Sequence, residues 1–127
     1  MANAPSRRTR SLPVSPAEFH ILLSLVDDER HGYGIMQQVA AESDGAIRLG
    51  PGTLYGAIKR LLAFDYIREA DERVDARLDD SRRKYYRLTD AGRTAVVREA
   101  ERLEGLVGLA RAKRIVAFPR RARGTSR

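Results

Sequence analysis

The amino-acid sequence predicts a mainly α-helical fold with a small β-hairpin. Apolar residues recur at helical spacing in three short segments before residue 65 and in one long segment after residue 89. Two β-favouring segments, 66–68 and 85–88, flank a charge-rich stretch with few apolar residues. The order helix, helix, helix, hairpin, long helix is that of a winged helix-turn-helix, whose third helix enters the major groove of DNA.

The length and composition suit one globular domain. The chain has 127 residues, of which 43% are hydrophobic. We divide it into a flexible basic arm (1–14), a winged-helix DNA-binding domain (15–88), a C-terminal dimerisation helix (89–117) and a disordered basic tail (118–127). No apolar run is long enough to span a membrane, and no signal-peptide core follows the arm, so we expect a cytoplasmic protein.

The net charge of +7 is concentrated at the two ends of the chain. Residues 16–110 hold 14 of the 24 basic residues and all 17 acidic residues, which gives this part a net charge of −3. Basic ends attract nucleic acid without regard to sequence. Specificity must therefore come from side chains of the domain itself.

A capping box predicts the start of the first helix in the segment 15–18. Ser15 is the expected N-cap, a proline takes the first helical position, and Glu18 follows three residues after the cap. An apolar stripe that includes Phe19, Leu22 and Val26 should face the core, and the charged run 27–30 should end the helix.

A turn at His31-Gly32-Tyr33-Gly34 leads into the second predicted helix. Its inner face carries Ile35 and Val39, whereas Gln37 and Gln38 point outward. The segment 43–45 breaks this helix. Alternating apolar residues at 47 and 49 then predict a short strand or an extended link.

The third helix should begin at Pro51 or Gly52. Its apolar stripe falls at i, i+4, i+7 and i+8, on Leu54, Ile58, Leu61 and Leu62. The opposite face offers a hydroxyl, a phenol, a small residue and two cations, and these belong to Thr53, Tyr55, Gly56, Lys59 and Arg60.

The fourth helix should begin at the cap Thr89 and run to about Ile115. Asp90 lies in its first turn, where the helix dipole favours an acid. Apolar residues recur at heptad-like spacing along it, at Val96, Ala100, Leu103, Val107 and Ala110, with Leu106 and Leu109 beside this seam. A helix with so much apolar surface predicts a homodimer, and the alternative is a helix that folds back onto its own domain and caps the first helix.

The candidate DNA-binding residues lie on the second helix, the third helix and the hairpin. Side chains at the start of the third helix can reach base edges, and cations further along can neutralise phosphates or read guanine. The hairpin tip also carries five acids, so a self-neutralised loop is the alternative there. The candidates are Tyr33, Gln37, Gln38, Gly52, Thr53, Tyr55, Lys59, Arg60, Arg82, Arg83 and Lys84.

The sequence offers no chemistry for an enzyme. There is no Cys, so disulfides, thiol nucleophiles and thiolate metal sites are excluded. His20 and His31 are the only histidines, and they form no metal-binding pair. We predict a protein without catalytic residues, metal or cofactor.

Three sequence blocks resemble the PadR family of bacterial transcriptional regulators. These are the blocks 31–35, 52–61 and 82–92, which read HGYGI, GTLYGAIKRL and RRKYYRLTDAG. The similarity covers about residues 12–110, and the single long helix at the end resembles the short branch of the family. Gly56 stands where relatives commonly have Pro, and the segment 64–67 replaces the usual Gly-Leu-Ile turn.

The resemblance implies a homodimer bound to a pseudo-palindromic double-stranded DNA operator, usually as a repressor. It implies that the first and last helices form the dimer. The candidate dimerisation residues are therefore Phe19, Leu22, Val96, Ala100, Leu103, Leu106, Val107 and Ala110. Two further functions stay open, a regulator that responds to an unidentified small-molecule effector and a winged-helix module that binds another protein.

Overall fold

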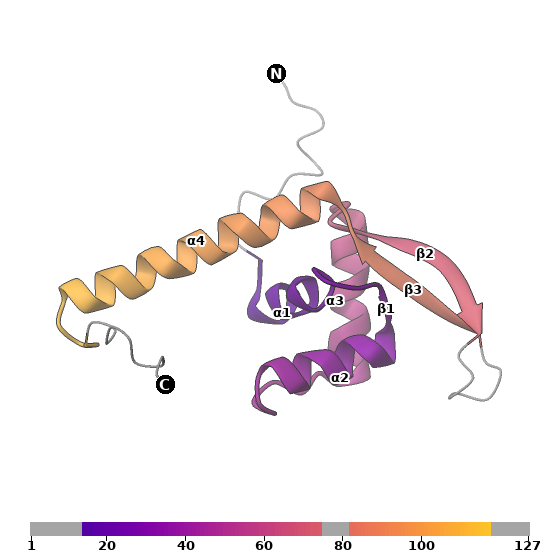
Figure 1. Ribbon diagram of the computed structural model, residues 1–127, viewed down its shortest axis with the longest axis horizontal. Helices are drawn as coiled ribbons and strands as arrows, with labels where there is room; N and C mark the ends of the chain where they lie inside the picture. The colour runs from indigo at the N-terminus through magenta and orange to yellow at the C-terminus, as the bar shows by residue number, and fades with distance from the viewer. Residues whose placement is uncertain (1–13, 75–81, 118–127) are drawn as a thin grey trace, which may run out of the picture.

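The computed structural model describes residues 14–74 and 82–117. Their elements are α1 (Pro16–Ser24), β1 (Arg30–His31), α2 (Gly32–Glu42), α3 (Pro51–Ala63), β2 (Ile67–Val74), β3 (Arg82–Leu88) and α4 (Asp90–Ala112). Helix α1 lies in the middle and packs against α2, α3 and α4 (Figure 1). This is the predicted mainly α-helical winged fold.

The small sheet has three antiparallel strands in the order β1-β3-β2, one more than the predicted hairpin. Strands β2 and β3 pair from Ile67 opposite Leu88, and β1 pairs Arg30 with Tyr86 on the other edge of β3. His31, which the sequence placed in a turn, therefore ends a strand. A strand of two residues has no alternation for a sequence pattern to detect.

Helix α1 begins as predicted. The Ser15 hydroxyl accepts a hydrogen bond from the Glu18 amide at 3.2 Å, and the Glu18 carboxylate accepts one from the Ser15 amide at 2.8 Å. The helix ends at Ser24, so the prediction that Val26 belongs to its stripe is wrong, and the Val26 side chain is 36% exposed.

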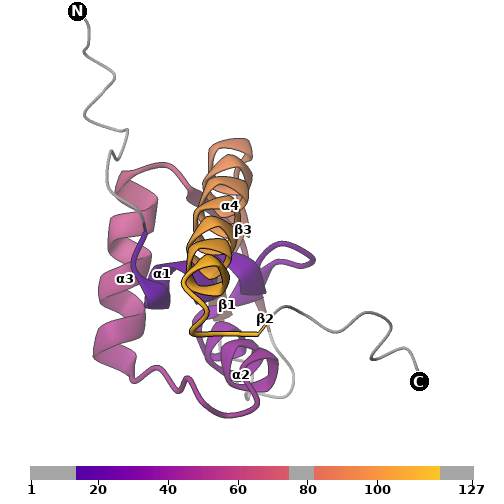
Figure 2. The same ribbon diagram turned by 90° about the vertical axis from the view of Figure 1, so that its left-hand side faces the viewer.

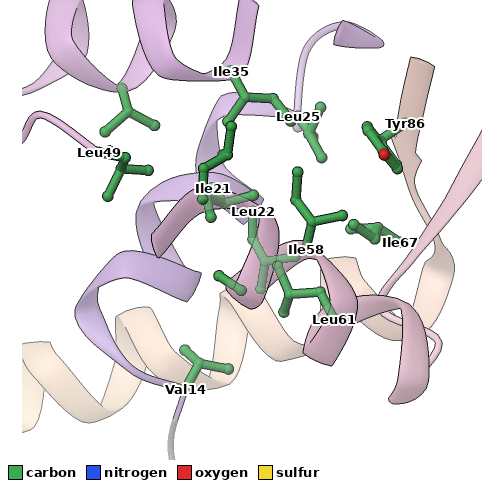
Figure 3. Packing of buried hydrophobic residues seen from close by; sticks show 13 residues of the cluster. Val14, Ile21, Leu22, Leu25, Ile35, Leu49, Ile58, Leu61, Ile67 and Tyr86 are labelled. Carbon is green, nitrogen blue, oxygen red and sulfur yellow. The ribbon is translucent and has the colours of Figure 1, made fainter. Parts of the chain in front are cut away.

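The hydrophobic core lies where α1, α2, α3 and the sheet meet. Ile21 and Leu22 of α1 and Leu61 of α3 are fully buried in it (Figure 3). Val14, which the prediction assigned to the basic arm, also belongs to this core and is 7% exposed. The predicted basic arm up to residue 13 and the tail 118–127 lie outside the described residues.

Helix α3 begins at Pro51, with Gly50 as its N-cap, and the segment before it is an extended link without strand pairing. The helix ends in a Schellman motif. The amides of Asp65 and Tyr66 donate to the carbonyl oxygens of Leu62 and Leu61, both at 3.0 Å. Asp65 adopts a φ of 64°, a left-handed conformation in which Asp costs less than most side chains.

A joint between the end of α3 and the start of α4 is built from Thr89 and Gly92. The Thr89 hydroxyl donates to the Asp65 carbonyl oxygen at 2.6 Å and accepts from the Gly92 amide at 2.9 Å. A β-carbon at Gly92 would lie 2.8 Å from Cδ1 of Leu88 and closer still to the carbonyl oxygen of Tyr66. Glycine is therefore required where α4 crosses the α3–β2 turn.

Helix α4 is 23 residues long, and its second half extends past α1 without covering it (Figure 1). It ends at Ala112 and not near residue 115 or 117 as predicted. A second Schellman motif causes this, because Arg114 takes a φ of 64° and the Ile115 amide donates to the Ala110 carbonyl oxygen.

Candidate nucleic-acid interface

Helix α3 has one buried face and one open face. The predicted stripe packs into the core, with Leu54 and Leu61 fully buried and Ile58 2% exposed. On the other side Thr53 and Lys59 are exposed, and the Tyr55 side chain is 51% exposed. The core contacts therefore fix the orientation in which α3 presents these side chains.

The N-terminal end of α3 is open to close approach by a ligand. A β-carbon at Gly50 or Gly52 would meet no atom within 4 Å, and no side chain caps the first turn. The free amide groups of such a turn favour a negatively charged group. This end lies beside α2, at the opposite end from the joint with α4 (Figure 2).

The two adjacent cations of α3 differ in what they contact. The Arg60 Nε donates to Oε2 of Glu18 at 2.8 Å, and that carboxylate is only 1% exposed. Glu18 thereby links the cap of α1 to the last turn of α3. For Lys59 the described part of the chain shows no ion-pair partner, so its ammonium remains available to a phosphate.

Helix α2 presents Tyr33 and Gln37 to solvent, and of these only Gln37 was predicted to point outward. Gln38 is half-buried, and its amide donates to the Glu42 carboxylate at 2.8 Å. The sequence did not identify His31 as the N-cap of this helix, although its Nδ1 accepts from the Gly34 amide at 3.0 Å. A polar cavity of about 350 Å³ lies beside these groups, lined by Asp28, Glu29, Arg30, His31, Gly34, Gln37, Gln38 and Tyr85.

Of the three cations predicted to bind DNA from the hairpin β2–β3, the structure describes the side chain of Lys84. The Lys84 ammonium lies 3.5 Å from the Glu69 carboxylate on the neighbouring strand, and both side chains are about half exposed. The backbones of Arg82 and Arg83 pair with β2 opposite Val74 and Arg73, but their side chains lie outside the described structure. The hairpin tip, 75–81, also lies outside it.

Tyr86 of β3 is a buried tyrosine with a perturbed phenol. Burial raises the pKa of the Tyr86 phenol above its ordinary value, and Glu69 and Tyr55 add smaller contributions in the same direction. Tyr86 is 6% exposed and belongs to the core.

The predicted dimerisation residues fall into three groups. Leu22 is fully buried within its own chain, so the prediction that it contributes to a dimer surface is wrong, because α1 is covered by three other helices. Phe19, Val96, Leu103 and Ala110 are half-buried. Ala100 is exposed, and Leu106 and Val107 are 50% and 42% exposed.

The matching family model decides the identity. Residues 21–98 match the model described as the transcriptional regulator PadR-like family. The chain belongs to the PadR-like family. The matched region runs from α1 through the hairpin into the first half of α4. PadR-like proteins regulate transcription, so this chain is a transcription regulator with a DNA-binding winged-helix fold and not an enzyme.

Two related proteins extend over most of this PadR-like chain. A protein named transcriptional regulator Rv3488, from Mycobacterium tuberculosis, is 34% identical over 97 residues, which cover 76% of this chain and 84% of that protein. An uncharacterized 37.1 kDa protein of the transposon TN4556 from Streptomyces fradiae is 38% identical over 92 residues. That match covers 72% of this chain but only 24% of the transposon protein.

Solved structures show the same fold. A PadR family regulator from Clostridium difficile aligns with a TM-score of 0.65 at 23% identity, covering 77% of this chain and 97% of that one. PadR of Bacillus subtilis, solved in complex with operator DNA, aligns with a TM-score of 0.56 at 23% identity. That match covers 66% of this chain and 46% of that chain. In the described part of the present structure, no helix is both long and apolar enough to cross a membrane.

Proposed function

We propose that this PadR-like protein is a sequence-specific repressor that binds a pseudo-palindromic DNA operator as a homodimer. The observation that carries the proposal is the open face of α3, where Thr53, Tyr55 and Lys59 are exposed opposite an apolar stripe that packs into the core. A helix held rigidly on one side and polar on the other is suited to the major groove.

Different parts of the surface would have different tasks. Thr53 and Tyr55, near the N-terminus of α3, would approach base edges and so read sequence. Lys59 and the cations of the hairpin would contact phosphates, which adds affinity without sequence preference. Repression is the mode of action that the family resemblance implies, because a dimer bound over a promoter blocks access to it.

Exposed apolar side chains on the C-terminal half of α4 support the proposal of a homodimer. Ala95 and Val96 pack against the core of their own chain, but Leu106, Val107 and Leu109 are 42–52% exposed beyond it. Covering the remaining surface of each would contribute about 1 kcal/mol. A two-fold contact between two copies of α4 would cover these side chains and present two α3 helices to the two halves of a palindrome.

The dimer is tested by changing side chains that the monomer does not need. Leu106→Asp combined with Val107→Asp should yield a folded monomer at tens of micromolar, measured by light scattering with circular dichroism as the check on folding. Arg98→Ala, an exposed change on the same helix, is the control. A parent protein with a monomer mass at that concentration would refute the dimer.

Selection of bound fragments from genomic DNA by the purified protein tests the operator. The parent should enrich a palindromic sequence, and a reporter carrying that sequence in its promoter should be silenced when the protein is present. The combined change Thr53→Ala, Tyr55→Ala and Lys59→Ala should abolish the enrichment. Each lost base contact should cost about 1–3 kcal/mol of binding free energy. Unchanged enrichment by this variant would refute the role of α3.

A further inference from the structure

Gly32, the first residue of α2, lies directly against the ring of Tyr55 on α3. A β-carbon at Gly32 would lie 2.8 Å from Cζ and 3.1 Å from Cε1 of Tyr55, and closer still to the hydroxyl oxygen. Contacts of a β-carbon below 3.0 Å are essentially never seen in proteins. The phenol of Tyr55 therefore occupies the space that any side chain at position 32 would need.

The obstacle to a side chain at position 32 is the far end of Tyr55, a side chain that would have to shift to make room. The φ of Gly32 lies outside the left-handed region, so an alanine could adopt this backbone conformation. Gly34, two residues further along α2, is different, because a β-carbon there would meet its nearest neighbours at 3.5–3.6 Å, an ordinary contact. The two glycines of the block 31–34 can therefore be compared directly, because a β-carbon at Gly32 would overlap Tyr55 and a β-carbon at Gly34 would overlap nothing.

The Tyr55 ring contacts the backbone of α2 at its hydroxyl end and is exposed to solvent elsewhere. Its hydroxyl end lies over Gly32, the first residue of α2. Half of the side chain nevertheless remains exposed on the open face of α3. A ring fixed on one side keeps a defined place in the interface, which lowers the cost of ordering it when DNA binds.

We propose that Gly32 is a positioning residue that sets the base preference of α3 by determining where the Tyr55 ring lies. This inference rests on the proposed function, because it assumes that the exposed part of Tyr55 contacts the operator. A side chain at position 32 would displace the ring by the overlap it creates, and a displacement on the order of 1 Å is enough to lose a base contact.

The test compares Gly32→Ala, Gly34→Ala, Tyr55→Ala and the double variant Gly32→Ala/Tyr55→Ala. Each full-length protein selects its preferred sites from a randomised DNA library, and its affinity for the parent's preferred site is measured by fluorescence anisotropy. Gly32→Ala should lose about tenfold or more in affinity for that site and change preference at the base pairs that Tyr55→Ala also affects. Gly34→Ala should leave both properties unchanged.

The double variant distinguishes positioning from a general structural effect. Once the ring is absent, Gly32→Ala should have no further effect, so its change in affinity should be at least tenfold smaller in the Tyr55→Ala background. Equal losses in both backgrounds would overturn the inference. If Gly32→Ala does not fold by circular dichroism, the comparison moves to the Tyr55→Phe background, where the closest overlapping atom is gone. Gly32→Ala must change the base preference there too, and an unchanged preference would overturn the inference.

Failure of this inference is distinguishable from failure of the proposed function. A parent protein that binds all sequences alike overturns the proposed function, and the positioning role with it. A parent with a clear preference that Gly32→Ala leaves unchanged overturns the positioning role alone.

Discussion

Removing the hydroxyl of Thr89 should destabilise the protein substantially, because this one group serves two backbone atoms. It caps α4 through the Gly92 amide at 2.9 Å and satisfies the Asp65 carbonyl oxygen at 2.6 Å. Loss of an N-cap costs about 0.5–2 kcal/mol, and loss of the second hydrogen bond costs about 0.5–1.5 kcal/mol. We therefore expect Thr89→Ala to lower the free energy of unfolding by about 2 kcal/mol.

This loss is measured by urea unfolding at a fixed protein concentration, together with thermal melts. For a domain of this size, about 2 kcal/mol corresponds to a fall in Tm of roughly 8 °C. Thr89→Ser is the matched control, since it keeps the hydroxyl and removes only a methyl group, and it should retain most of the stability. The reasoning is refuted if Thr89→Ala melts within about a degree of the parent, or if Thr89→Ser is equally destabilised.

Three further outcomes are expected. Arg60→Ala should lower the free energy of unfolding by about 1–3 kcal/mol in urea melts, because Oε2 of the buried Glu18 carboxylate loses its ion pair with the guanidinium; an effect no larger than that of an exposed α4 control such as Arg98→Ala would contradict this. Gly105→Ala with Gly108→Ala should raise the free energy of unfolding in urea melts by about 1–2 kcal/mol, because each glycine costs a helix interior about 1 kcal/mol and a β-carbon at either position meets no atom within 4 Å in the chain itself; unchanged or lowered stability would count against it. Stability should fall as the pH rises above about 10, because the unfolded chain releases the Tyr86 proton before the folded chain does; thermal melts of Tyr86→Phe should show a shallower fall, and an identical profile would rule out this cause.

The features that follow from nearby residues were predictable from the sequence. The caps at Ser15 and Thr89, the proline at the start of α3 and the buried stripe of α3 each depend on groups within about two turns. The spacing of apolar residues also gave the order of the elements and, through the winged-helix fold, α3 as the expected recognition helix. The family resemblance added the homodimer and its palindromic operator as expectations.

The features that depend on distant residues were not predictable in this way. Two such features are the pairing of β1 with β3 and the ion pair between Glu18 and Arg60, which lie 42 residues apart. The spacing of residues within one helix or strand does not indicate contacts of this kind. Periodicity identified Leu22 as apolar but did not show which surface covers it. The contact between Gly32 and Tyr55 was missed for the same reason, although an unexplained glycine at the start of a helix is a signal that something approaches closely.

The joint of Thr89 and Gly92 with the α3–β2 turn has a consequence for the proposed dimer. Because α4 meets the carbonyl groups of this turn with a short hydroxyl and a glycine, no long side chain is present to absorb a rotation between α4 and α3. The angle at which two α4 helices cross would therefore fix the distance between the two α3 helices. The number of base pairs separating the halves of an operator would then be set by residues that never touch DNA, and changes along α4 could alter that number while the bases read within each half stay the same.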